Sequence, residues 1–313
     1  IIRLHTDPQF AADDLRGAAV FLQQAWRPGD TIIVNAGYTY TALRHYYTAP
    51  VDRYLRLADF TPGTAQRNPY APLVLQTGLV NGPPSLGWGD PQSDFYAMSE
   101  QETIAALQAV SKQYPRLWVL RAYDTVTDPA GIIRHWLSEN TLQFEDRPIG
   151  GPSNFRVQGF FSPKQPPPPQ QTDDTFAGRF KLRGFTPPGS RYHAGDKIYV
   201  TLWLEALAGL SAEPPYAVSL KLWDSRGNMA AQSDEWPAGS LYFSPQWPPG
   251  QIVRHPMQLQ LPPDTRPGQY WLDVQLYRSD GSVPLPVNGS DKTGVTLGKI
   301  EVVGENPGRV APH

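Results

Sequence analysis

The sequence predicts two folded domains, an α/β domain followed by an all-β domain, joined by a proline-rich linker. Its 313 residues suffice for about two domains at roughly 100–200 residues each. Helical and strand-like apolar patterns alternate in the first half, whereas only strand-like patterns occur in the second. Between the halves lies Lys164–Gln171, KQPPPPQQ, and since proline cannot donate a backbone hydrogen bond, this run predicts an extended spacer outside any sheet or helix. The predicted boundaries are 1–163 for the α/β domain, 164–172 for the linker, 173–304 for the β domain and 305–313 for a disordered tail.

The first half begins with an amphipathic helix and an apolar strand. Ala11–Trp26 has apolar residues at helical spacing, and Asp13 and Asp14 fall in its predicted first turn, where acidic groups favour the helix dipole. The β-branched run Thr31–Asn35 is typical of a strand that is buried on both faces. A short helix is then predicted within 38–47, and a second strand at Tyr54–Ala58.

The rest of this half continues the alternation. The passage Thr61–Pro91 is rich in glycine and proline and predicts a long functional loop. Ser99 and Glu102 fit a capping box that begins a helix reaching Tyr114. The elements expected after it are a buried strand at Arg116–Ala122, a helix with Asp128 as N-cap and Pro129 at its first position, and two final strands in LQFED and NFRVQGFF. Helices alternating with apolar strands predict a small doubly wound, Rossmann-like domain.

Polar side chains follow two of the predicted strands. Because ligands of doubly wound sheets bind beyond the carboxyl ends of the strands, the candidate ligand-binding residues here are Asn35, Tyr38, Arg121 and Asp124. Polar residues in such positions more often cap loops and helices, so a structural role is the competing interpretation. One functional hypothesis is therefore an enzyme that acts at these strand ends.

The second half consists of alternating apolar and polar runs separated by turns. The runs are RFKLRGF, KIYVTLWLEA, YAVSLKLWD, VRHPMQLQL, YWLDVQLYR and VTLGKIEVV. Clusters of Pro, Gly, Asp and Ser between them suit tight turns, among them a hairpin at Asp224–Asn228. Several strands with one apolar face each predict an antiparallel, immunoglobulin-like β-sandwich. We expect its core to include Trp203, Leu220, Leu222, Leu272, Val274 and Leu276.

Composition and motifs argue against several kinds of chemistry. With a formal net charge of -2 and 18% charged residues, the chain lacks the basic surface that nucleic-acid binding needs. It has no cysteine, which excludes disulfides and thiolate catalysis, and its six histidines show no metal-ligand spacing. Acidic pairs such as Asp173–Asp174 and Asp234–Glu235 are adjacent in sequence and would point to opposite faces of a strand. We therefore predict no cofactor, no metal and no catalytic residue in this chain.

Aromatic residues near turns and strand ends are the stronger binding signal. Flat rings can stack on the faces of sugars, although the same rings could cover the ends of the sandwich. Trp247, within QWPPGQ, is the foremost candidate ligand-binding residue of the second half. The other aromatics in such positions are Trp88, Trp236, Tyr242, Tyr270 and Trp271.

Two groups of segments resemble a known protein family. DDLRGAAVFLQQAWRPGDTIIVNAGY, ALRHYY and RLWVLRAYDTVTDPAGIIRHWL resemble the soluble region after the membrane spans of bacterial family-39-like glycosyltransferases, relatives of the dolichyl-phosphate-mannose protein mannosyltransferases. GDKIYVTLWLEA, YAVSLKLWDSRGNMAAQSDEWP and the segment Trp247–Gly281 resemble the β-sandwich appended to many of these proteins. In that family the polyprenyl-phosphate-sugar donor and the catalytic acid belong to the membrane portion. No segment of this chain matches that portion, so the resemblance assigns no catalytic residue here.

The resemblance implies a non-catalytic extracytoplasmic region, tethered to the membrane, whose sandwich presents or recognises a glycan or protein acceptor. Its partners would be that acceptor and the membrane-embedded portion of the same polypeptide, and the linker would hold the two domains at a set distance. A start at Ile1 and the lack of an apolar stretch of ~18 residues are as expected for a piece of such a protein. The alternative is a free-standing secreted carbohydrate-binding or adhesion module.

Overall fold

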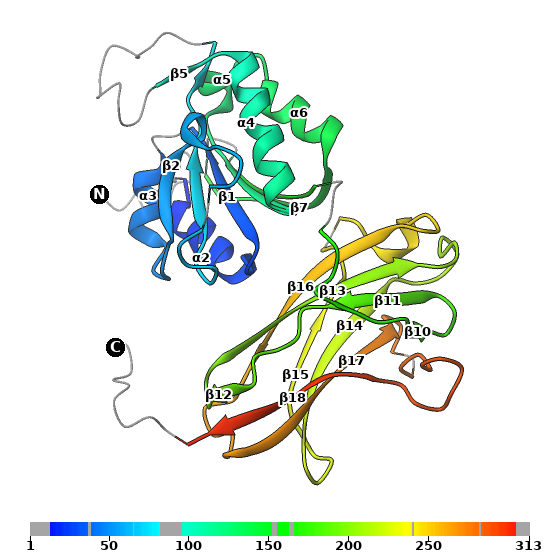
Figure 1. Cartoon of the computed structure of the whole chain (residues 1–313). Coiled ribbons are helices and arrows are strands. Elements are labelled where there is room, and N and C mark those ends of the chain that lie inside the picture. The colour runs from blue at the N-terminus through cyan, green and yellow to red at the C-terminus, as the bar shows by residue number, and fades with distance from the viewer. Residues whose placement is uncertain are drawn as a thin grey trace, which may run out of the picture. The chain divides into compact units, whose positions relative to one another are not determined.

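The computed structural model describes residues 13–36, 39–64, 66–81, 96–151, 155–162, 166–239, 241–281 and 283–304. The chain is rich in β-strands, which form several sheets (Figure 1). It divides into two compact units, unit 1 (Ile1–Pro166) and unit 2 (Pro167–His313). The division falls inside the predicted linker, and each unit has a sheet architecture of its own.

The described part of unit 1 is built on a six-stranded sheet with the order β2-β3-β1-β6-β8-β7. Strands β2, β3, β1 and β6 are parallel, whereas β8 runs antiparallel to β6, and β7 antiparallel to β8. The strands are β1 (Asp30–Asn35), β2 (Arg53–Arg56), β3 (Leu73–Gln76), β6 (Arg116–Arg121), β7 (Leu142–Pro148) and β8 (Arg156–Phe161). Two further short strands, β4 (Leu79–Val80) and β5 (Ala97–Met98), pair with each other.

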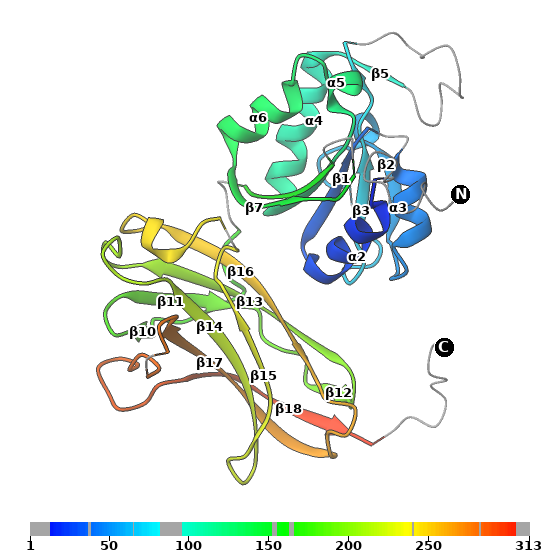
Figure 2. The same ribbon diagram turned by 180° about the vertical axis from the view of Figure 1, so that it is seen from behind.

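Helices cover both faces of this sheet (Figure 2). One face carries α2 (Leu15–Ala25) beside α3 (Tyr40–Tyr46), and the other carries α4 (Glu100–Gln113) beside α6 (Ile132–Asn140). Because successive side chains of a strand point to opposite faces, alternate strand residues supply the two cores. Ile33, Leu75 and Val119 belong to the core that includes residues of α4 and α6. The predicted alternation of helices and buried strands is confirmed for these elements.

The predicted long loop is wrong in its middle part. Leu73–Gln76 forms β3, a fully buried strand between β2 and β1. A strand buried on both faces is an unbroken apolar run without alternation, and this short one lies among glycines and prolines that favour a loop assignment. Residues 82–91 of the same passage lie outside the described residues. The two predicted final strands are β7 and β8, and because they are antiparallel the sheet is mixed.

Side-chain caps begin two of the helices. The capping box before α4 is confirmed, since the Ser99 hydroxyl accepts from the Glu102 N–H (3.2 Å) and the Glu102 carboxylate accepts from the Ser99 N–H (2.8 Å). Asp13 and Asp14 precede α2 rather than occupying its first turn. The Asp14 carboxylate instead accepts a hydrogen bond from the Gly17 N–H (2.7 Å) as the N-cap.

Asp128 holds the start of α6 without being its N-cap, which corrects the predicted arrangement. The N-cap is Gly131, at φ 70°, and Pro129 precedes the helix. The Asp128 carboxylate accepts hydrogen bonds from the N–H groups of Ile132 (2.7 Å) and Ile133 (2.8 Å). Burial nevertheless raises the pKa of Asp128 above its usual value, because it disfavours the charged form.

The variant Asp128→Asn is expected to gain stability relative to the wild type as the pH rises from about 3 to 7. A carboxyl whose pKa is higher in the folded than in the unfolded state binds its proton more tightly when folded. Its contribution to stability is therefore complete below the unfolded pKa and is lost as the pH rises through the folded pKa. Urea unfolding of both proteins across this range measures the difference, and a constant difference or the opposite trend contradicts the prediction.

A charged pair is buried at the amino end of the sheet, where Asp30 of β1 lies opposite Arg116 of β6. Asp30 Oδ2 lies 3.3 Å from Arg116 Nη2 and accepts hydrogen bonds from Trp118 Nε1 and the Arg27 N–H, each at 3.0 Å. The Arg116 guanidinium also lies over the Phe144 ring, 4.8 Å from its centroid. These contacts fix the first residue of β1 against β6.

The described part of unit 2 is a sandwich of two five-stranded sheets. The first sheet has the order β10-β11-β13-β16 with β9 also beside β11, and the second has the order β12-β18-β17-β14-β15. All pairs are antiparallel except β12 with β18. The strands are β9 (Gln170–Gln171), β10 (Thr175–Phe176), β11 (Phe180–Phe185), β12 (Arg191–His193), β13 (Lys197–Ala206), β14 (Tyr216–Asp224), β15 (Met229–Glu235), β16 (Ile252–Gln260), β17 (Gly268–Arg278) and β18 (Val295–Val303).

The inward-facing residues of the two sheets form the core of unit 2. Phe180 of β11 contacts Tyr216 of β14 across the sandwich, with ring centroids 5.0 Å apart. Trp203 is buried as predicted, but it alternates along β13 with inward-facing leucines and so belongs to the outer face of its sheet. The other predicted core residues are all fully buried inside: Leu220, Leu222, Leu272, Val274 and Leu276.

The second half of the predicted linker belongs to unit 2 and is not a free spacer. Gln170 and Gln171 form β9, which pairs with Phe185 and Gly184 of β11. Only glycine fits at position 184, because φ is 156° and an added Cβ would lie 2.1 Å from the Gln170 carbonyl oxygen. Extended proline segments have nearly the backbone angles of a strand, so the glutamines can pair where the prolines cannot. The spacing role of the linker stays a prediction, and residues 163–165 and 305–313 lie outside the described residues.

Candidate functional site

The carboxyl edge of the unit 1 sheet brings together three of the residues predicted there. β1 and β6 are parallel neighbours, and their register places Asn35 beside Arg121. Asp124 follows Arg121 by three residues in the sequence. Asn35 is buried, and its Oδ1 accepts hydrogen bonds from Thr77 Oγ1 (3.3 Å) and Thr127 Oγ1 (3.4 Å). The Asn35 side chain thus joins the end of β1 to the segments that follow β3 and β6, as the structural interpretation expects.

Arg121 and Asp124 pair with each other at this edge. Arg121 Nε lies 2.7 Å from Asp124 Oδ2, and both side chains are partly exposed. Tyr123 between them has φ 45°, in the left-handed region, and turns the chain from β6 into the short helix α5 (Asp124–Thr127). Tyr38 lies outside the described residues. Ligand binding at this edge therefore stays a prediction.

Tyr96 ties together the ends of β2 and β3. Its hydroxyl donates to the Gln76 carbonyl oxygen (2.5 Å) and accepts from the Leu57 N–H (3.0 Å). Burial raises the pKa of Tyr96, and the Arg56 guanidinium lies over its ring, 5.2 Å from the centroid. The phenol is therefore a protonated, hydrogen-bonded tie. No local sequence pattern predicts that Tyr96 joins β2 and β3, because Tyr96 is far in sequence from the residues it contacts.

Trp247 is part of the core of unit 2, so its prediction as a sugar-stacking residue is wrong. It is 1% exposed. The Phe180 ring lies edge-on to it at a centroid distance of 6.0 Å, and its indole N–H donates to the Tyr242 carbonyl oxygen (3.1 Å). The turn residues that flank Trp247 suggest a surface position, but the indole ring points inward. Its single polar group, the N–H, has a hydrogen-bond partner there.

Two other tryptophans lie side by side on the outer face of the second sheet of unit 2. The register of β14 and β17 places Trp223 directly opposite Trp271, and alternation with fully buried neighbours turns both outward. Met229 of β15 is opposite Trp223, and Lys299 of β18 is opposite Trp271. Met229, Trp223, Trp271 and Lys299 form a line across four strands, which we call the tryptophan row.

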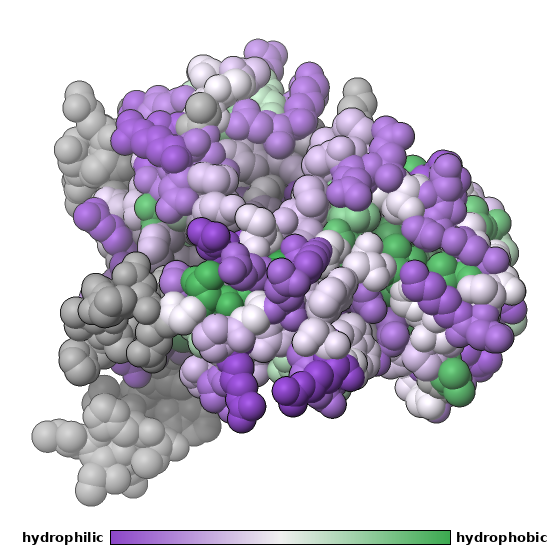
Figure 3. All heavy atoms as spheres, turned by 60° about the horizontal axis from the view of Figure 1, so that its bottom comes forward, coloured by the Kyte–Doolittle hydropathy of each residue, from purple (hydrophilic) through white to green (hydrophobic). Residues whose placement is uncertain are grey.

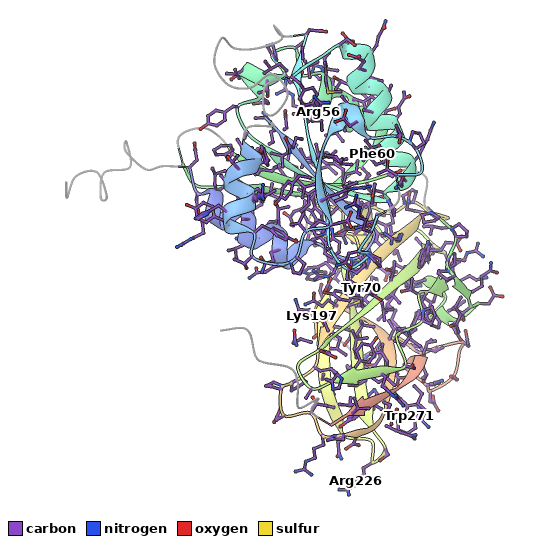
Figure 4. All side chains as sticks on the ribbon, turned by 60° about the vertical axis from the view of Figure 1, so that its left-hand side comes forward. Arg56, Phe60, Tyr70, Lys197, Arg226 and Trp271 are labelled. Atoms are coloured by element: carbon purple, nitrogen blue, oxygen red, sulfur yellow. The ribbon has the colours of Figure 1, made fainter. Side chains whose placement is uncertain are left out.

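The tryptophan row is accessible. Trp223 and Trp271 are partly exposed, Met229 is 50% exposed, and Lys299 Nζ lies 5.5 Å from the centroid of the Trp271 ring. Figure 4 shows Trp271 toward the same end of unit 2 as Arg226. In the view of Figure 3, hydrophilic side chains dominate and apolar ones form small separate patches. Flat rings on a rigid sheet, beside polar side chains, are a surface on which pyranose rings can stack.

The predicted hairpin next to the tryptophan row is confirmed. It joins β14 to β15, and the Asp224 N–H donates to the Asn228 carbonyl oxygen (2.9 Å). The Asp224 carboxylate accepts from the N–H groups of Arg226 and Asn228, both at 2.8 Å. Hydrogen bonds from Asn228 lower the pKa of Asp224. This turn fixes the register that brings Met229 beside Trp223.

The remaining predicted aromatics are less suited to stacking. Tyr270 is buried, and Trp88 lies outside the described residues. Trp236 is 39% exposed, with the Phe243 ring edge-on at 5.4 Å. Trp271 is among the predicted residues, whereas Trp223 is not. The alternation of YAVSLKLWD places Trp223 on the outer face, but its pairing with Trp271 depends on a register that the sequence alone leaves open.

The adjacent acidic residues of unit 2 have separate surroundings. Asp173 Oδ1 lies 2.7 Å from Lys181 Nζ, and the hydrogen bond with Lys181 lowers the Asp173 pKa. Asp234 and Glu235 are consecutive in β15 and point to opposite faces of the sheet, as predicted. Within the described ranges, no three His, Asp or Glu side chains are grouped to hold a metal ion.

Comparisons with known proteins give only distant structural likenesses. No protein-family model and no curated protein matches the sequence. Similar solved structures include the C-terminal domain of wzt, at 8% identity and a TM-score of 0.33, covering 45% of this chain and 84% of that one. A CARDB domain from Pyrococcus furiosus has 13% identity, a TM-score of 0.24 and coverages of 39% and 90%. A family 123 glycoside hydrolase from Clostridium perfringens has 11% identity, a TM-score of 0.23 and coverages of 42% and 27%.

Likenesses at these identities and TM-scores carry no argument about the function of this chain. Among the helices in the described part of the chain, none is long and apolar enough to span a membrane.

Proposed function

We propose that unit 2 recognises carbohydrate through the tryptophan row, as part of a non-catalytic extracytoplasmic region of a membrane glycosyltransferase. The cross-strand pair Trp223–Trp271 carries the carbohydrate part of this proposal. The glycosyltransferase part, with its membrane-embedded portion and acceptor as partners, rests on the resemblance of the sequence segments. We also propose that unit 1 is a Rossmann-like domain and that unit 2 is an immunoglobulin-like domain.

The physical case for sugar binding is the partly exposed apolar area of two neighbouring rings. Single exposed apolar residues are normal on protein surfaces, whereas adjacent large ones mark binding sites more often. β14 and β17 hold the two rings in place before any ligand arrives, so little conformational entropy is lost on binding. Lys299 Nζ, which lies over the Trp271 ring at 5.5 Å from its centroid, supplies a donor for sugar oxygens.

Trp271→Ala and Trp223→Ala are each expected to weaken binding of an oligosaccharide by roughly tenfold, the loss of one aromatic contact worth about 1.4 kcal/mol. Calorimetric titration with the ligands selected from a glycan panel by the wild type measures the loss. Trp236→Ala is the matched control, because Trp236 is also exposed but directly follows β15, at the other end of that strand from Met229. Equal losses in all three variants, or no binding by the wild type, contradict the proposal.

The membrane tether is tested separately by reading the gene upstream of Ile1. Several apolar spans of about 20 residues each are expected there. A lone signal peptide would instead make the chain a free-standing secreted module.

A further inference from the structure

Next to the tryptophan row, three polar side-chain atoms are buried without a hydrogen-bond partner among the described residues. They are Ser219 Oγ, Asp273 Oδ1 and Gln275 Oε1. Ser219 is 0% exposed and Gln275 8% exposed. Buried polar groups in folded proteins nearly always have a partner, so three orphaned atoms close together point to a missing one.

The strand register places these three residues, the acceptor cluster, on the same face as the tryptophan row. Ser219 of β14 is directly opposite Gln275 of β17. Along β17, Trp271, Asp273 and Gln275 are alternate residues, so their side chains share one face. From Trp271 to Gln275 the strand rises roughly 14 Å, which exceeds the length of one pyranose ring. The row and the acceptor cluster therefore form one strip along β17, long enough for consecutive sugars.

The oxygen atoms of the acceptor cluster favour a ligand that carries hydrogen-bond donors. A carboxylate oxygen and an amide oxygen only accept hydrogen bonds, and a hydroxyl can accept as well. Sugar hydroxyls supply donors, whereas carboxylate, sulfate or phosphate groups present acceptors only and are repelled by Asp273. Lys221 is opposite Asp273, yet the structure contains no ion pair between these two described residues. Asp234, opposite Ser219, adds a second negative charge at the edge of the cluster.

We infer that the strip binds a neutral, hydroxyl-rich glycan: one sugar stacks on the tryptophan row, and the next donates adjacent hydroxyls to Asp273 and Gln275. Resting on the proposed function, this inference adds the substrate class, uncharged rather than anionic saccharide, and names the residues that set it. The strand scaffold positions these groups in advance, and the partly exposed Lys221 and the exposed Gln232, which pair across β14 and β15, would change rotamer to admit the sugar.

The test compares a neutral oligosaccharide, taken from the wild-type panel, with its derivative in which the primary alcohols are oxidised to uronic acids. The wild type is expected to bind the neutral form about tenfold or more tightly than the acidic one. Asp273→Asn, which replaces one acceptor oxygen by a donor and removes the charge, should weaken neutral binding and bring the two affinities together. Gln275→Leu should weaken neutral binding alone. Glu139→Gln, an exposed carboxylate-to-amide change on α6, should alter neither affinity.

The outcomes separate this inference from the proposed function. If Trp271→Ala weakens binding but Asp273→Asn and Gln275→Leu leave both affinities unchanged, the substrate class is wrong while sugar recognition stands. If the wild type binds neither saccharide, both fail. If calcium alone changes the tryptophan fluorescence and a chelator abolishes sugar binding, the acceptor cluster is a cation site, and the inference is overturned. Near-UV circular dichroism of each variant confirms that its fold is retained before affinities are compared.

Discussion

Replacing Trp247 with alanine is expected to lower the free energy of unfolding of unit 2 by about 3–5 kcal/mol. The indole is almost completely enclosed, with Phe180 edge-on and its N–H hydrogen-bonded to the Tyr242 carbonyl oxygen. The substitution removes a large apolar volume, leaves a cavity, and orphans that carbonyl oxygen. Urea unfolding, followed by far-UV circular dichroism, measures the change.

The matched control is Trp236→Ala, which removes the same side chain from a position that is 39% exposed. We expect it to lose about 1 kcal/mol or less, because surface substitutions leave no enclosed cavity. Similar losses in both variants would show that the enclosure of Trp247 is not the source of the effect. The distinction matters for binding assays, since a ligand response lost in Trp247→Ala would report unfolding rather than a lost sugar contact.

Trp247 also shows which part of the site the sequence could not predict. A tryptophan between turn residues can point outward or inward, and only its packing against Phe180, in a distant strand, decides between them. Trp223 presents the opposite case. Its outward direction follows from strand alternation, but its partner Trp271 depends on a register set by the hairpin Asp224–Asn228 and by the sheet as a whole.

The fold was predictable where local chemistry is decisive. The capping box at Ser99, the β-branched run of β1 and the alternating runs of unit 2 all became the expected elements. β3 and β9 were not predictable in this way. Leu73–Gln76 is too short and too uniformly apolar to reveal its period, and Gln170–Gln171 pairs only because Gly184 lets another backbone approach closely. Their formation depends on tertiary contacts rather than on local propensity.

Asp30→Ala is expected to destabilise unit 1 by about 3–5 kcal/mol, the usual cost of breaking a buried ion pair by removing one of its members. Asp30 Oδ2 accepts hydrogen bonds from the Trp118 indole N–H and the Arg27 backbone N–H, and it lies 3.3 Å from Arg116 Nη2. The Arg116 side chain is 7% exposed, so water cannot readily replace the lost carboxylate. Urea unfolding followed by circular dichroism measures the loss.

A surface ion pair in the same unit provides the comparison. Arg56 and Asp59 are paired at 2.8 Å, but their side chains are 36% and 47% exposed. Asp59→Ala should therefore cost no more than about 1 kcal/mol, because water and salt screen the pair. A loss as large as that of Asp30→Ala would mean that burial is not what distinguishes the two pairs.

The double variant Asp30→Ala with Arg116→Met isolates the cause of the larger effect. If the broken ion pair with Arg116 dominates, removing that guanidinium as well should recover part of the stability lost in Asp30→Ala, since a buried ion pair contributes little beyond its apolar replacement. If the two losses simply add, the cost lies instead in the hydrogen bonds that Trp118 and Arg27 donate to Asp30. Either result identifies the interaction that holds β1 against β6. The same strand pair ends at Asn35 and Arg121, so this interaction also supports the carboxyl edge of the sheet.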